Sequence, residues 1–350
     1  KIEHVIWLQT AFIGDLVLSS ASFCLLAAKR KKIKQHLITT AAGAEIYKSQ
    51  AEISGVYVLR KKNIKFLGDL FEVKKILRQK GLNKKNTLIL QAHKSYRSSL
   101  SSFYLSFPTS TFEESSLSFL ADWRTPKVAV FHEASRQSLL LASLNISREE
   151  ILSVRPKLKG LSFTGEKTWH KLFLQEDKKF IALVPGSVWA TKKWPLSSYK
   201  DLALKLLGET EYQLIFLGSE KESKETLWLE KEVLKAEPKF KERIINLGGK
   251  TDLSELLMVF PRLLLLIAND SSAIHFASAF DLATVAIFGP TSSKMGFSPK
   301  ASRKKSIEND DLDCRPCHVH GPKICPLSHF ACMNSVSSQK VFLACKELLS

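Results

Sequence analysis

The sequence predicts an α/β protein in which each half of the chain forms a domain around a parallel sheet. Short apolar runs at residues 5–8, 36–39, 55–59 and 87–91 alternate with helical patterns in the first half, and after a polar, basic segment at about 155–179 the alternation starts again. Apolar strands that alternate with helices are typical of parallel βαβ units. A chain of 350 residues also suits two domains better than a single core.

The pattern predicts most elements of both halves. The first half is expected to contain a helix from the turn at 10–15 to about residue 28, a second helix at about 67–80, and a helix followed by a loop at 98–114. The second half is expected to contain strands at 180–184, 213–217, 244–247, 263–268 and 283–288, helices at about 196–207, 221–236 and 273–280, and a capping box at 251–255 that starts one more helix.

Turn residues follow nearly every predicted strand of the second half. The strand at 180–184 ends in Pro185-Gly186, and the strand at 263–268 ends in Asn269-Asp270-Ser271-Ser272. Ligands of open α/β sheets bind at the carboxyl ends of the strands. The second half therefore has the layout of a nucleotide-binding domain.

Charge is distributed unevenly along the chain. Residues 1–175 carry 28 Lys and Arg against 13 Asp and Glu, whereas residues 176–350 carry 24 against 21. The excess indicates an anionic partner for the first half, such as nucleic acid, an anionic membrane surface or a phosphorylated lipid, or else simply solvated lysines. The longest purely apolar run, at 263–268, is too short to span a bilayer. Basic residues follow the apolar stretch at 16–28, which disfavours a secretory signal.

The loop after the strand at 180–184 contains groups that can hold a diphosphate. Ser187, Thr191 and Lys192 supply hydroxyl and ammonium groups beside free backbone N–H groups, which together form a phosphate cradle. The alternative is an exposed loop with incidental lysines. Trp189 and Trp194 would be costly to expose, and this favours a built site.

Further candidate residues lie at helix starts. Asp270 and Ser271 either cap the helix that follows them or present its N-terminus to an anion. His275, about one turn later, is either a hydrogen-bonded core residue or a site residue. Glu222 is placed to hold a ribose hydroxyl pair, although acidic residues are also common in first helical turns.

The first strand-to-helix turn of the chain contains Gly14-Asp15. Gly14 is expected to let the backbone turn tightly. Asp15 either caps the helix or faces a cleft as a general base, and the helix dipole at that position favours an ionised carboxylate.

Four of the six cysteines are grouped at Cys314, Cys317, Cys325 and Cys332. Four thiolates could close a tetrahedral, structural zinc site, with nearby histidines as substitute ligands. The second pair lacks the usual Cys-x2-Cys spacing. Reduced structural cysteines, or a pair that oxidises on purification, are the other interpretations.

Together these segments resemble a known family. Ile13-Gly14-Asp15, the loop from Pro185-Gly186-Ser187 to Trp194-Pro195, Asn269-Asp270-Ser271, Phe288-Gly289-Pro290-Thr291 and the cysteine-rich stretch occur in the order and spacing of the ADP-heptose:lipopolysaccharide heptosyltransferases, glycosyltransferase family nine, and are most similar to the heptosyltransferase II type. The resemblance covers nearly the whole chain and is weakest at about 95–175.

The resemblance implies a GT-B fold, with two Rossmann-like domains facing a central cleft. Residues 1–170 would form the acceptor-binding domain and 171–335 the nucleotide-sugar-binding domain. The C-terminal helix at 336–350 would pack back on the N-terminal domain.

The resemblance also implies roles for the candidate residues. Asp15 would be the general base of an inverting transfer, and Lys192 would stabilise the departing ADP. Ser187 and Lys192 would contact the diphosphate, Glu222 the ribose, Asp270 the sugar hydroxyls and Ser271 the phosphates. Gly14, Thr191 and His275 complete the predicted set. Catalysis would require no cofactor or metal ion. The Asp311-Leu312-Asp313 pattern, which metal-dependent transferases use, lies in a polar, acidic loop beside the cysteines and is interpreted as solvated surface.

The implied partners are ADP-heptose and an acceptor made of Kdo-lipid A or a heptosylated inner core. A cytoplasmic monomer in peripheral contact with the anionic face of the inner membrane, and without nucleic acid, is expected. The same fold with another nucleotide sugar or acceptor is an open alternative. A zinc-containing nucleic-acid-binding protein is an alternative of another class, but few aromatic residues lie near the cysteines. A nicotinamide-dependent dehydrogenase would need a Gly-x-Gly-x-x-Gly run, which this sequence lacks.

Overall fold

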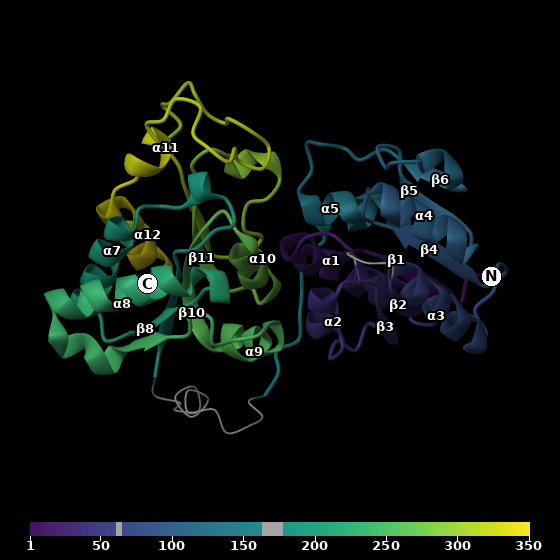
Figure 1. The fold of residues 1–350 in the computed structure, drawn as a ribbon, viewed down its shortest axis with the longest axis horizontal. Helices are drawn as coiled ribbons and strands as arrows, with labels where there is room; N and C mark the ends of the chain where they lie inside the picture. Colours follow the sequence, from purple (N-terminus) through teal and green to yellow (C-terminus); the bar gives the residue numbers. More distant parts are fainter. Residues whose placement is uncertain (61–64, 163–177) are drawn as a thin grey trace. The chain divides into compact units, whose positions relative to one another are not determined.

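A computed structural model describes residues 1–60, 65–162 and 178–350 of the chain (Figure 1). These residues form two compact units, Lys1–Lys159 (unit 1) and Gly160–Ser350 (unit 2). Each unit contains a six-stranded parallel sheet with helices, which confirms the predicted fold class. The unit boundary precedes the predicted one at residue 170, and most of the polar segment expected there, 163–177, lies outside the described residues.

The sheet of unit 1 has the strand order β3-β2-β1-β4-β5-β6, and every neighbouring pair is parallel. This is the order of a doubly wound nucleotide-binding fold. The strands are β1 (His4–Leu8), β2 (Lys34–Thr39), β3 (Gly55–Val58), β4 (Thr87–Gln91), β5 (Thr109–Phe112) and β6 (Trp123–Thr125); the helices are α1 (Ile13–Lys29), α2 (Ala41–Tyr47), α3 (Lys65–Gln79), α4 (Tyr96–Leu105), α5 (Glu133–Ser138) and α6 (Arg148–Ser153), with 3₁₀ turns η1 (Ser118–Leu120) and η2 (Leu139–Leu144).

The sheet of unit 2 repeats this topology in the order β12-β11-β10-β7-β8-β9. Its strands are β7 (Phe180–Val184), β8 (Gln213–Phe216), β9 (Ile244–Asn246), β10 (Leu263–Asn269), β11 (Ala283–Ile287) and β12 (Lys304–Ile307); its helices are α7 (Leu196–Glu209), α8 (Ser223–Ala236), α9 (Leu253–Val259), α10 (Ser272–Ala279), α11 (Ala331–Asn334) and α12 (Ser338–Leu349), with 3₁₀ turns η4 (Ala190–Lys192), η5 (Glu220–Glu222), η6 (Pro238–Arg243), η7 (Phe260–Arg262) and η8 (Ser293–Met295).

Every predicted strand is present, and the predicted capping box begins α9 through Asp252 and Glu255. Three strands were not predicted because their sequences lack an apolar pattern. β5 reads Thr-Ser-Thr-Phe, β6 has three largely exposed residues, and β12 begins with two lysines. β6 and β12 are edge strands, where polar residues are tolerated because one side of the strand faces no neighbour.

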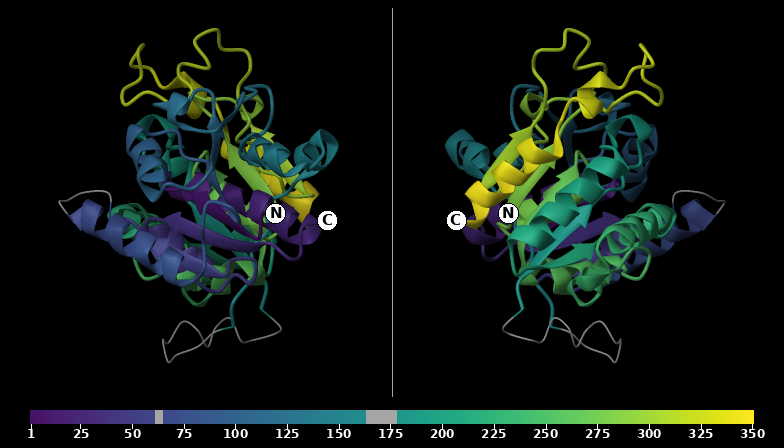
Figure 2. Two further views of the ribbon diagram at one scale, coloured as in Figure 1. Left: turned by 90° about the vertical axis from the view of Figure 1, so that its right-hand side faces the viewer. Right: turned by 90° about the vertical axis from the view of Figure 1, so that its left-hand side faces the viewer.

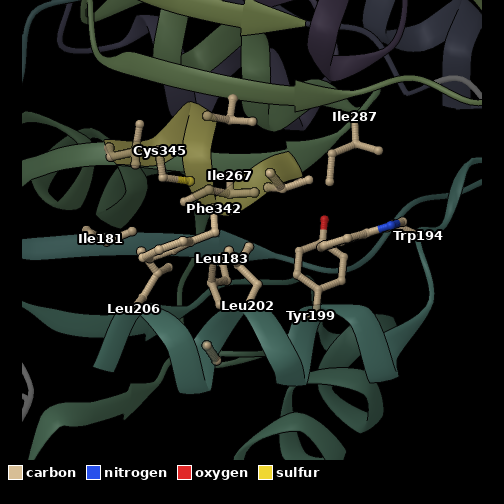
Figure 3. Close-up of a cluster of buried hydrophobic side chains, with 14 of the residues drawn as sticks. Ile181, Leu183, Trp194, Tyr199, Leu202, Leu206, Ile267, Ile287, Phe342 and Cys345 are labelled. Atoms are coloured by element: carbon tan, nitrogen blue, oxygen red, sulfur yellow. The ribbon is translucent and has the colours of Figure 1, made fainter. Parts of the chain in front are cut away.

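The core of unit 2 lies between its sheet and the helices α7 and α12. Figure 3 shows Ile181, Leu183 and Ile267 of the sheet in one cluster with Leu202 and Leu206 of α7 and Phe342 and Cys345 of α12. Helix α12 had been expected to pack back on the N-terminal domain, but its buried face contributes to this core. Its apolar positions recur at the helical period, so burial against the adjacent sheet accounts for its position.

The described residues include no helix that is long and apolar enough to cross a membrane.

A buried histidine in β2 makes the stability of unit 1 sensitive to pH. The ring of His36 lies 3.1 Å from that of His4 and 3.4 Å from the hydroxyl of Tyr57. Burial, followed by the charges of His4 and nearby lysines, lowers the pKa of His36 to about 4. The unfolded chain takes up this proton near pH 6.5, whereas the folded chain stays neutral until about pH 4.

We therefore expect the free energy of unfolding to fall as pH decreases from about 6.5 to 4, by up to about 3 kcal/mol from this residue. Urea unfolding of the natural protein and of His36→Gln at several pH values measures the effect. The variant, which does not titrate at this position, should lose stability less steeply. His329→Gln, at an exposed position, serves as the control. Equal slopes for all three proteins would contradict the prediction.

Candidate functional site

The strand order of unit 2 reverses between β7 and β10, and a buried asparagine joins the ends of these two strands. The side-chain amide of Asn269 donates to the carbonyl oxygens of Pro185 (2.8 Å) and Gly186 (3.3 Å). Its oxygen accepts from the backbone N–H of Trp194 (3.1 Å) and the hydroxyl of Tyr199 (3.2 Å). Ligands of doubly wound sheets bind at such a reversal. The structure therefore fixes the two predicted loops next to each other at the expected place.

A buried ion pair joins the same two loops. The amine of Lys192, in η4, donates to Oδ2 of Asp270 at 2.6 Å, and the hydroxyl of Thr291 donates to the same oxygen at 2.8 Å. Both charged residues are only 8% exposed. Two charges are stable at such depth when they are paired and hydrogen-bonded. The structure thus brings together two residues that lie far apart in the sequence and that the sequence had marked as candidates.

The cysteine-rich segment covers the stem of Lys192. Gly321 has φ +81°, and a Cβ there would lie 3.0 Å from Cε of Lys192. The hydroxyl of Thr191 donates to the carbonyl of Pro322. Thr191 was predicted to face the donor, and in the structure its hydroxyl holds this covering segment in place. Figure 2 shows the segment in yellow as extended loops at one end of unit 2.

A buried arginine anchors the segment to the strand ends. The guanidinium of Arg315 donates to the carbonyls of Gly289 (2.8 Å) and Thr291 (2.6 Å) and to the carboxylate of Glu308 (2.5 Å). Its side chain is 3% exposed. A rigid guanidinium that donates to several fixed acceptors holds its neighbours in one geometry. Arg315 therefore positions Thr291, which in turn holds Asp270.

Helix α10 begins next to this ion pair. Ser271 is its N-cap but makes no side-chain bond to the helix, and within the described residues its buried Oγ has no hydrogen-bond partner. The N–H groups of a first helical turn lack intrahelical acceptors and attract anions. Ser187 is buried in the facing loop. His275, also buried, lies one turn into α10 with its ring 6.2 Å from that of Phe297.

Glu222 lies against the loop that follows β7. Its Oε2 accepts from the backbone N–H and the hydroxyl of Ser219 at 2.9 and 2.7 Å. Its Oε1 would be 2.4 Å from a Cβ at Gly186, so only glycine fits at that position without displacing the carboxylate. The predicted ribose-binding residue is thus adjacent to the predicted phosphate-binding loop.

The four grouped cysteines carry no disulfide. All are free, and Cys317 Sγ donates to the carbonyl of Cys314 at 3.0 Å. Burial raises the pKa of Cys332, and the neighbouring thiols, Cys317 first, raise it further. Among residues 1–60, 65–162 and 178–350, no group of three or more His, Cys, Asp or Glu is arranged to hold a metal ion. This arrangement does not support the predicted zinc site, which stays a hypothesis.

In unit 1, Asp15 lies in the first turn of α1, as predicted. Gly14 is the second residue of that helix, so it lies within the first turn and not in the turn before it, in contrast to the prediction. The carbonyl of Asp15 accepts from the hydroxyl of Ser19 (2.9 Å) and the amide of Gln137 (3.3 Å).

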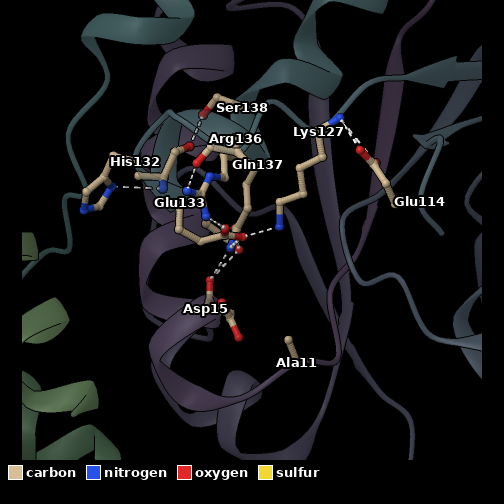
Figure 4. A network of polar contacts seen from close by, with 12 residues as sticks. Ala11, Asp15, Glu114, Lys127, His132, Glu133, Arg136, Gln137 and Ser138 are labelled. Carbon is tan, nitrogen blue, oxygen red and sulfur yellow. Dashed lines mark hydrogen bonds and ion pairs between the residues drawn. The ribbon is translucent and has the colours of Figure 1, made fainter. Parts of the chain in front are cut away.

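A charged network lies beside Asp15. Glu133, whose side chain is 5% exposed, pairs with the amine of Lys127 at 2.6 Å and the guanidinium of Arg136 at 3.3 Å. Gln137 links the network to α1, because its amide also donates to Oε1 of Glu133 at 3.3 Å (Figure 4). Gln137 thus ties Glu133 and its two cationic partners to the start of α1.

Unit 1 also has a pocket where its own strand order reverses. The pocket has a volume of about 360 Å³ and lies at the ends of β1 and β4. Thr10 and Ser98 in its wall both contact Nδ1 of His93, at 2.8 and 3.0 Å. Arg97 also lines it. This wall offers hydroxyl, imidazole and guanidinium groups to a polar ligand.

Comparison with known proteins identifies the family. The model of "Glycosyltransferase family 9 (heptosyltransferase)" matches residues 77–326. The chain belongs to this family. The match includes the candidate residues Ser187, Lys192 and Asp270 and extends into the cysteine-rich segment as far as residue 326. Cys314, Cys317 and Cys325 therefore lie within the matched transferase family, which disfavours a separate nucleic-acid-binding module, whereas Cys332 lies beyond the match. Asp15 lies outside the matched range.

Individual relatives agree with this assignment. Lipooligosaccharide heptosyltransferase 2 of Campylobacter jejuni subsp. jejuni serotype O:6 is 30% identical over 202 residues, which cover 57% of this family 9 chain and 61% of the relative. The E. coli ADP-heptose lps heptosyltransferase II has the same fold, with a TM-score of 0.76, 18% identity, and coverage of 99% of this chain and 98% of that one. The E. coli heptosyltransferase WaaC with ADP-2-deoxy-2-fluoro heptose has a TM-score of 0.71, 13% identity and coverage of 98% and 99%.

The sequence did not indicate several residues that organise the site. Asn269 was noted only in a turn and a family motif, Thr291 only as part of a motif, and Arg315 lies unmarked between Cys314 and Cys317. The signal available for Asn269 is an amide directly after the most apolar strand, next to Asp270. The sequence gives no comparable signal for the network around Glu133, because no recognisable motif contains its members and only the folded chain brings them together.

The buried ion pair gives a test of this geometry. Asp270→Ala leaves a buried, unpaired ammonium, so we expect it to reduce the free energy of unfolding by about 3–5 kcal/mol. Adding Lys192→Met should restore much of that loss, because the buried charge is then gone as well. Urea unfolding of both single variants and the double variant measures the coupling energy.

The half-exposed pair of Lys193 and Glu225, with its amine and carboxylate 2.5 Å apart, is the matched control. Its coupling energy should be below about 1 kcal/mol. Additive losses for Asp270 and Lys192 would show that the two charges do not depend on each other.

Proposed function

We propose that this family 9 protein is an inverting glycosyltransferase that moves a heptose from ADP-heptose to the Kdo or heptose residues of the lipopolysaccharide inner core. The observation that carries the proposal is the order of groups along one edge of the sheet in unit 2. Asp270 follows β10, Ser187 and Lys192 follow β7, and Glu222 follows β8. These three strands are neighbours in the sheet.

This order matches the order of groups in a nucleotide sugar. Adjacent strands lie about 4.8 Å apart, so three strand ends span about 10 Å. The sugar would bind at Asp270, the diphosphate at Ser187, Lys192 and the N-terminus of α10, and the ribose at Glu222. The sugar and the β-phosphate share an oxygen, so the groups that bind them must be adjacent. The 2.6 Å contact between Lys192 and Asp270 meets this requirement.

Related proteins support ADP-heptose as the donor, but they do not establish it for this chain. WaaC of E. coli has been solved with ADP-2-deoxy-2-fluoro heptose, and the E. coli heptosyltransferase II is described by its ADP-heptose donor. At 13% and 18% identity, this likeness to solved structures concerns the fold. The aligned part of the Campylobacter relative is 61% of its length, so donor and acceptor are proposals for this chain.

Unit 1 is the proposed acceptor-binding unit. Its pocket at the ends of β1 and β4 presents Arg97, His93 and several hydroxyl groups. Kdo carries a carboxylate and lipid A carries phosphates, and a guanidinium binds either anion through charge-assisted hydrogen bonds. We place the protein as a monomer at the cytoplasmic face of the inner membrane, where such an acceptor would be available.

The proposed reaction is a direct displacement. The acceptor oxygen forms a bond to the anomeric carbon while the bond from that carbon to the ADP oxygen breaks, and the configuration inverts. The acceptor proton passes to the carboxylate of Asp15. Negative charge develops on ADP, where Lys192 and the first N–H groups of α10 stabilise it. In this mechanism the chain's own groups neutralise the leaving group.

A donor screen tests the proposal. The purified full chain should consume ADP-heptose in the presence of Kdo-lipid A and release ADP, whereas UDP-glucose and GDP-mannose should remain intact. Chromatography of the nucleotides measures the reaction, and mass spectrometry of the acceptor detects the added heptose. If another nucleotide sugar is consumed and ADP-heptose is neither bound nor consumed, the heptose assignment is wrong.

Asp15→Asn tests the proposed base separately. Loss of a general base typically lowers turnover by about 10²–10⁴-fold. The affinity for ADP should be unchanged, because the donor groups are in unit 2. Glu149→Gln, an acidic residue in the first turn of another unit 1 helix, is the control and should keep full turnover. Near-normal turnover of a folded Asp15→Asn protein would remove Asp15 from the mechanism.

A further inference from the structure

Helix α4 has its polar and apolar faces reversed relative to an ordinary surface helix. Four of its serines are buried: Ser98, Ser99, Ser101 and Ser102. Tyr96, Leu100, Phe103 and Tyr104 recur at the helical period and are 39–61% exposed. A helix at the surface of a water-soluble fold normally turns its apolar stripe towards the core.

The buried serines explain why the helix keeps this orientation. The hydroxyl of Ser102 donates to Oε1 of Gln91 at the end of β4 (2.7 Å), and that of Ser99 donates to the carbonyl of Ser116. Ser98 contacts His93 at 3.0 Å. Because these buried hydroxyls have hydrogen-bond partners, their burial costs little. The exposure of the apolar residues on the opposite face of α4 still needs an explanation.

Helix α3 extends the exposed apolar stripe. Leu67 and Phe71, one helical turn apart, are 69% and 56% exposed. Cation–π contacts join the helices: the guanidinium of Arg97 lies 5.5 Å from the ring centre of Phe66, and the amine of Lys74 lies 4.4 Å from that of Tyr104. We call the set formed by Leu67, Phe71, Tyr96, Leu100, Phe103 and Tyr104 the α3/α4 surface.

Basic residues accompany this apolar surface. The same two helices carry Lys65, Lys74, Lys75, Arg78 and Arg97. Their acidic residues are Asp69, which is paired with Arg60, and Glu72. Exposed aromatic and aliphatic side chains bordered by Lys and Arg are typical of helices that lie in the interface of an anionic bilayer. Lysine is depleted in protein–protein interfaces, which disfavours a protein partner.

We propose that the α3/α4 surface binds the anionic face of a lipid bilayer, with its aromatic side chains at the level of the headgroups. This inference rests on the proposed function in so far as the acceptor is borne by a lipid. Phe66, Tyr96 and Arg97 also line the pocket of unit 1. Contact with the bilayer would therefore bring the pocket to the headgroups from which an acceptor extends.

Vesicle flotation of the full chain tests the proposal without a sugar nucleotide or an acceptor. The natural protein should float with vesicles of phosphatidylglycerol and phosphatidylethanolamine, and less with phosphatidylcholine alone. The triple variant Leu100→Ser, Phe103→Ser, Tyr104→Ser should bind about tenfold less or weaker still. Lys75→Gln with Arg78→Gln should weaken binding to the anionic vesicles only, and added salt should reduce this difference.

Three exposed apolar residues on helices of unit 2 provide the matched control. Leu227, Trp228 and Leu343 are 39–51% exposed, and their replacement by serine removes similar side chains from elsewhere on the chain. This variant should float like the natural protein. Equal loss for both triple variants would mean that general hydrophobicity, and not the α3/α4 surface, drives binding, and would overturn the proposal.

A single substitution gives a second readout that does not depend on the triple variant folding. A Phe103→Trp protein should lose tryptophan fluorescence when vesicles contain brominated acyl chains, more than the natural protein does. Absence of additional quenching would overturn the proposal. So would concentration-dependent dimerisation of the natural protein that the triple variant abolishes, because the surface would then join two copies.

The outcomes separate this inference from the proposed function. Transfer of heptose to a lipid-free acceptor by a protein that does not float would overturn the bilayer contact alone. Flotation through the α3/α4 surface by a protein that consumes no ADP-heptose would overturn the donor assignment alone.

Discussion

The side-chain amide of Asn269 is the contact on which the arrangement of unit 2 depends. It lies at the reversal of strand order, is fully buried, and bonds to the loop between β7 and α7 and to Tyr199 of α7. A buried amide that lost these partners would destabilise the fold by up to several kcal/mol, so the arrangement that satisfies them is strongly favoured. The ends of β7 and β10 are therefore held in one relative position, and the groups next to Asn269 and Gly186 are positioned as a consequence.

The polar groups around this contact form a chain in which each one positions the next. Asn269 fixes the start of the loop that carries Ser187 and Lys192, and Asp270, the next residue, pairs with Lys192. Thr291 adds a hydrogen bond to Asp270, and Arg315 holds the carbonyl of Thr291. Buried polar groups that are fully hydrogen-bonded are rigid, and rigid groups bind a charged ligand with little reorganisation. The cysteine-rich segment is part of this arrangement. Its Arg315 bonds to the carbonyl of Thr291, and its Gly321 packs against the side chain of Lys192.

The sequence predicted the parts of the fold that depend on local pattern. Continuous apolar runs such as residues 263–268 identified the central strands, and the residues after them identified the loops of the site. What it missed depends on contacts between distant residues. β5 and β6 are polar strands that exist because they pair with β4 and with each other. The roles of Asn269 and Arg315 come from partners that are distant in the chain. Gly14 was misplaced because a glycine before an acidic residue is as compatible with a first helical turn as with the turn that precedes it.

Helix α4 shows how one sequence feature can place two surfaces together. Its serines form hydrogen bonds at the end of β4, so the helix lies beside the strand ends that line the pocket of unit 1. Successive helical residues are about 100° apart, so a face made of serines leaves the aromatic residues no position except the outside. An outward aromatic stripe is thus a consequence of tying the helix to the pocket through hydroxyl groups. A leucine-rich inner face would have buried the apolar residues and left the same pocket without its hydroxyl wall. The composition of the helix therefore links the chemistry of the pocket to that of the surface beside it.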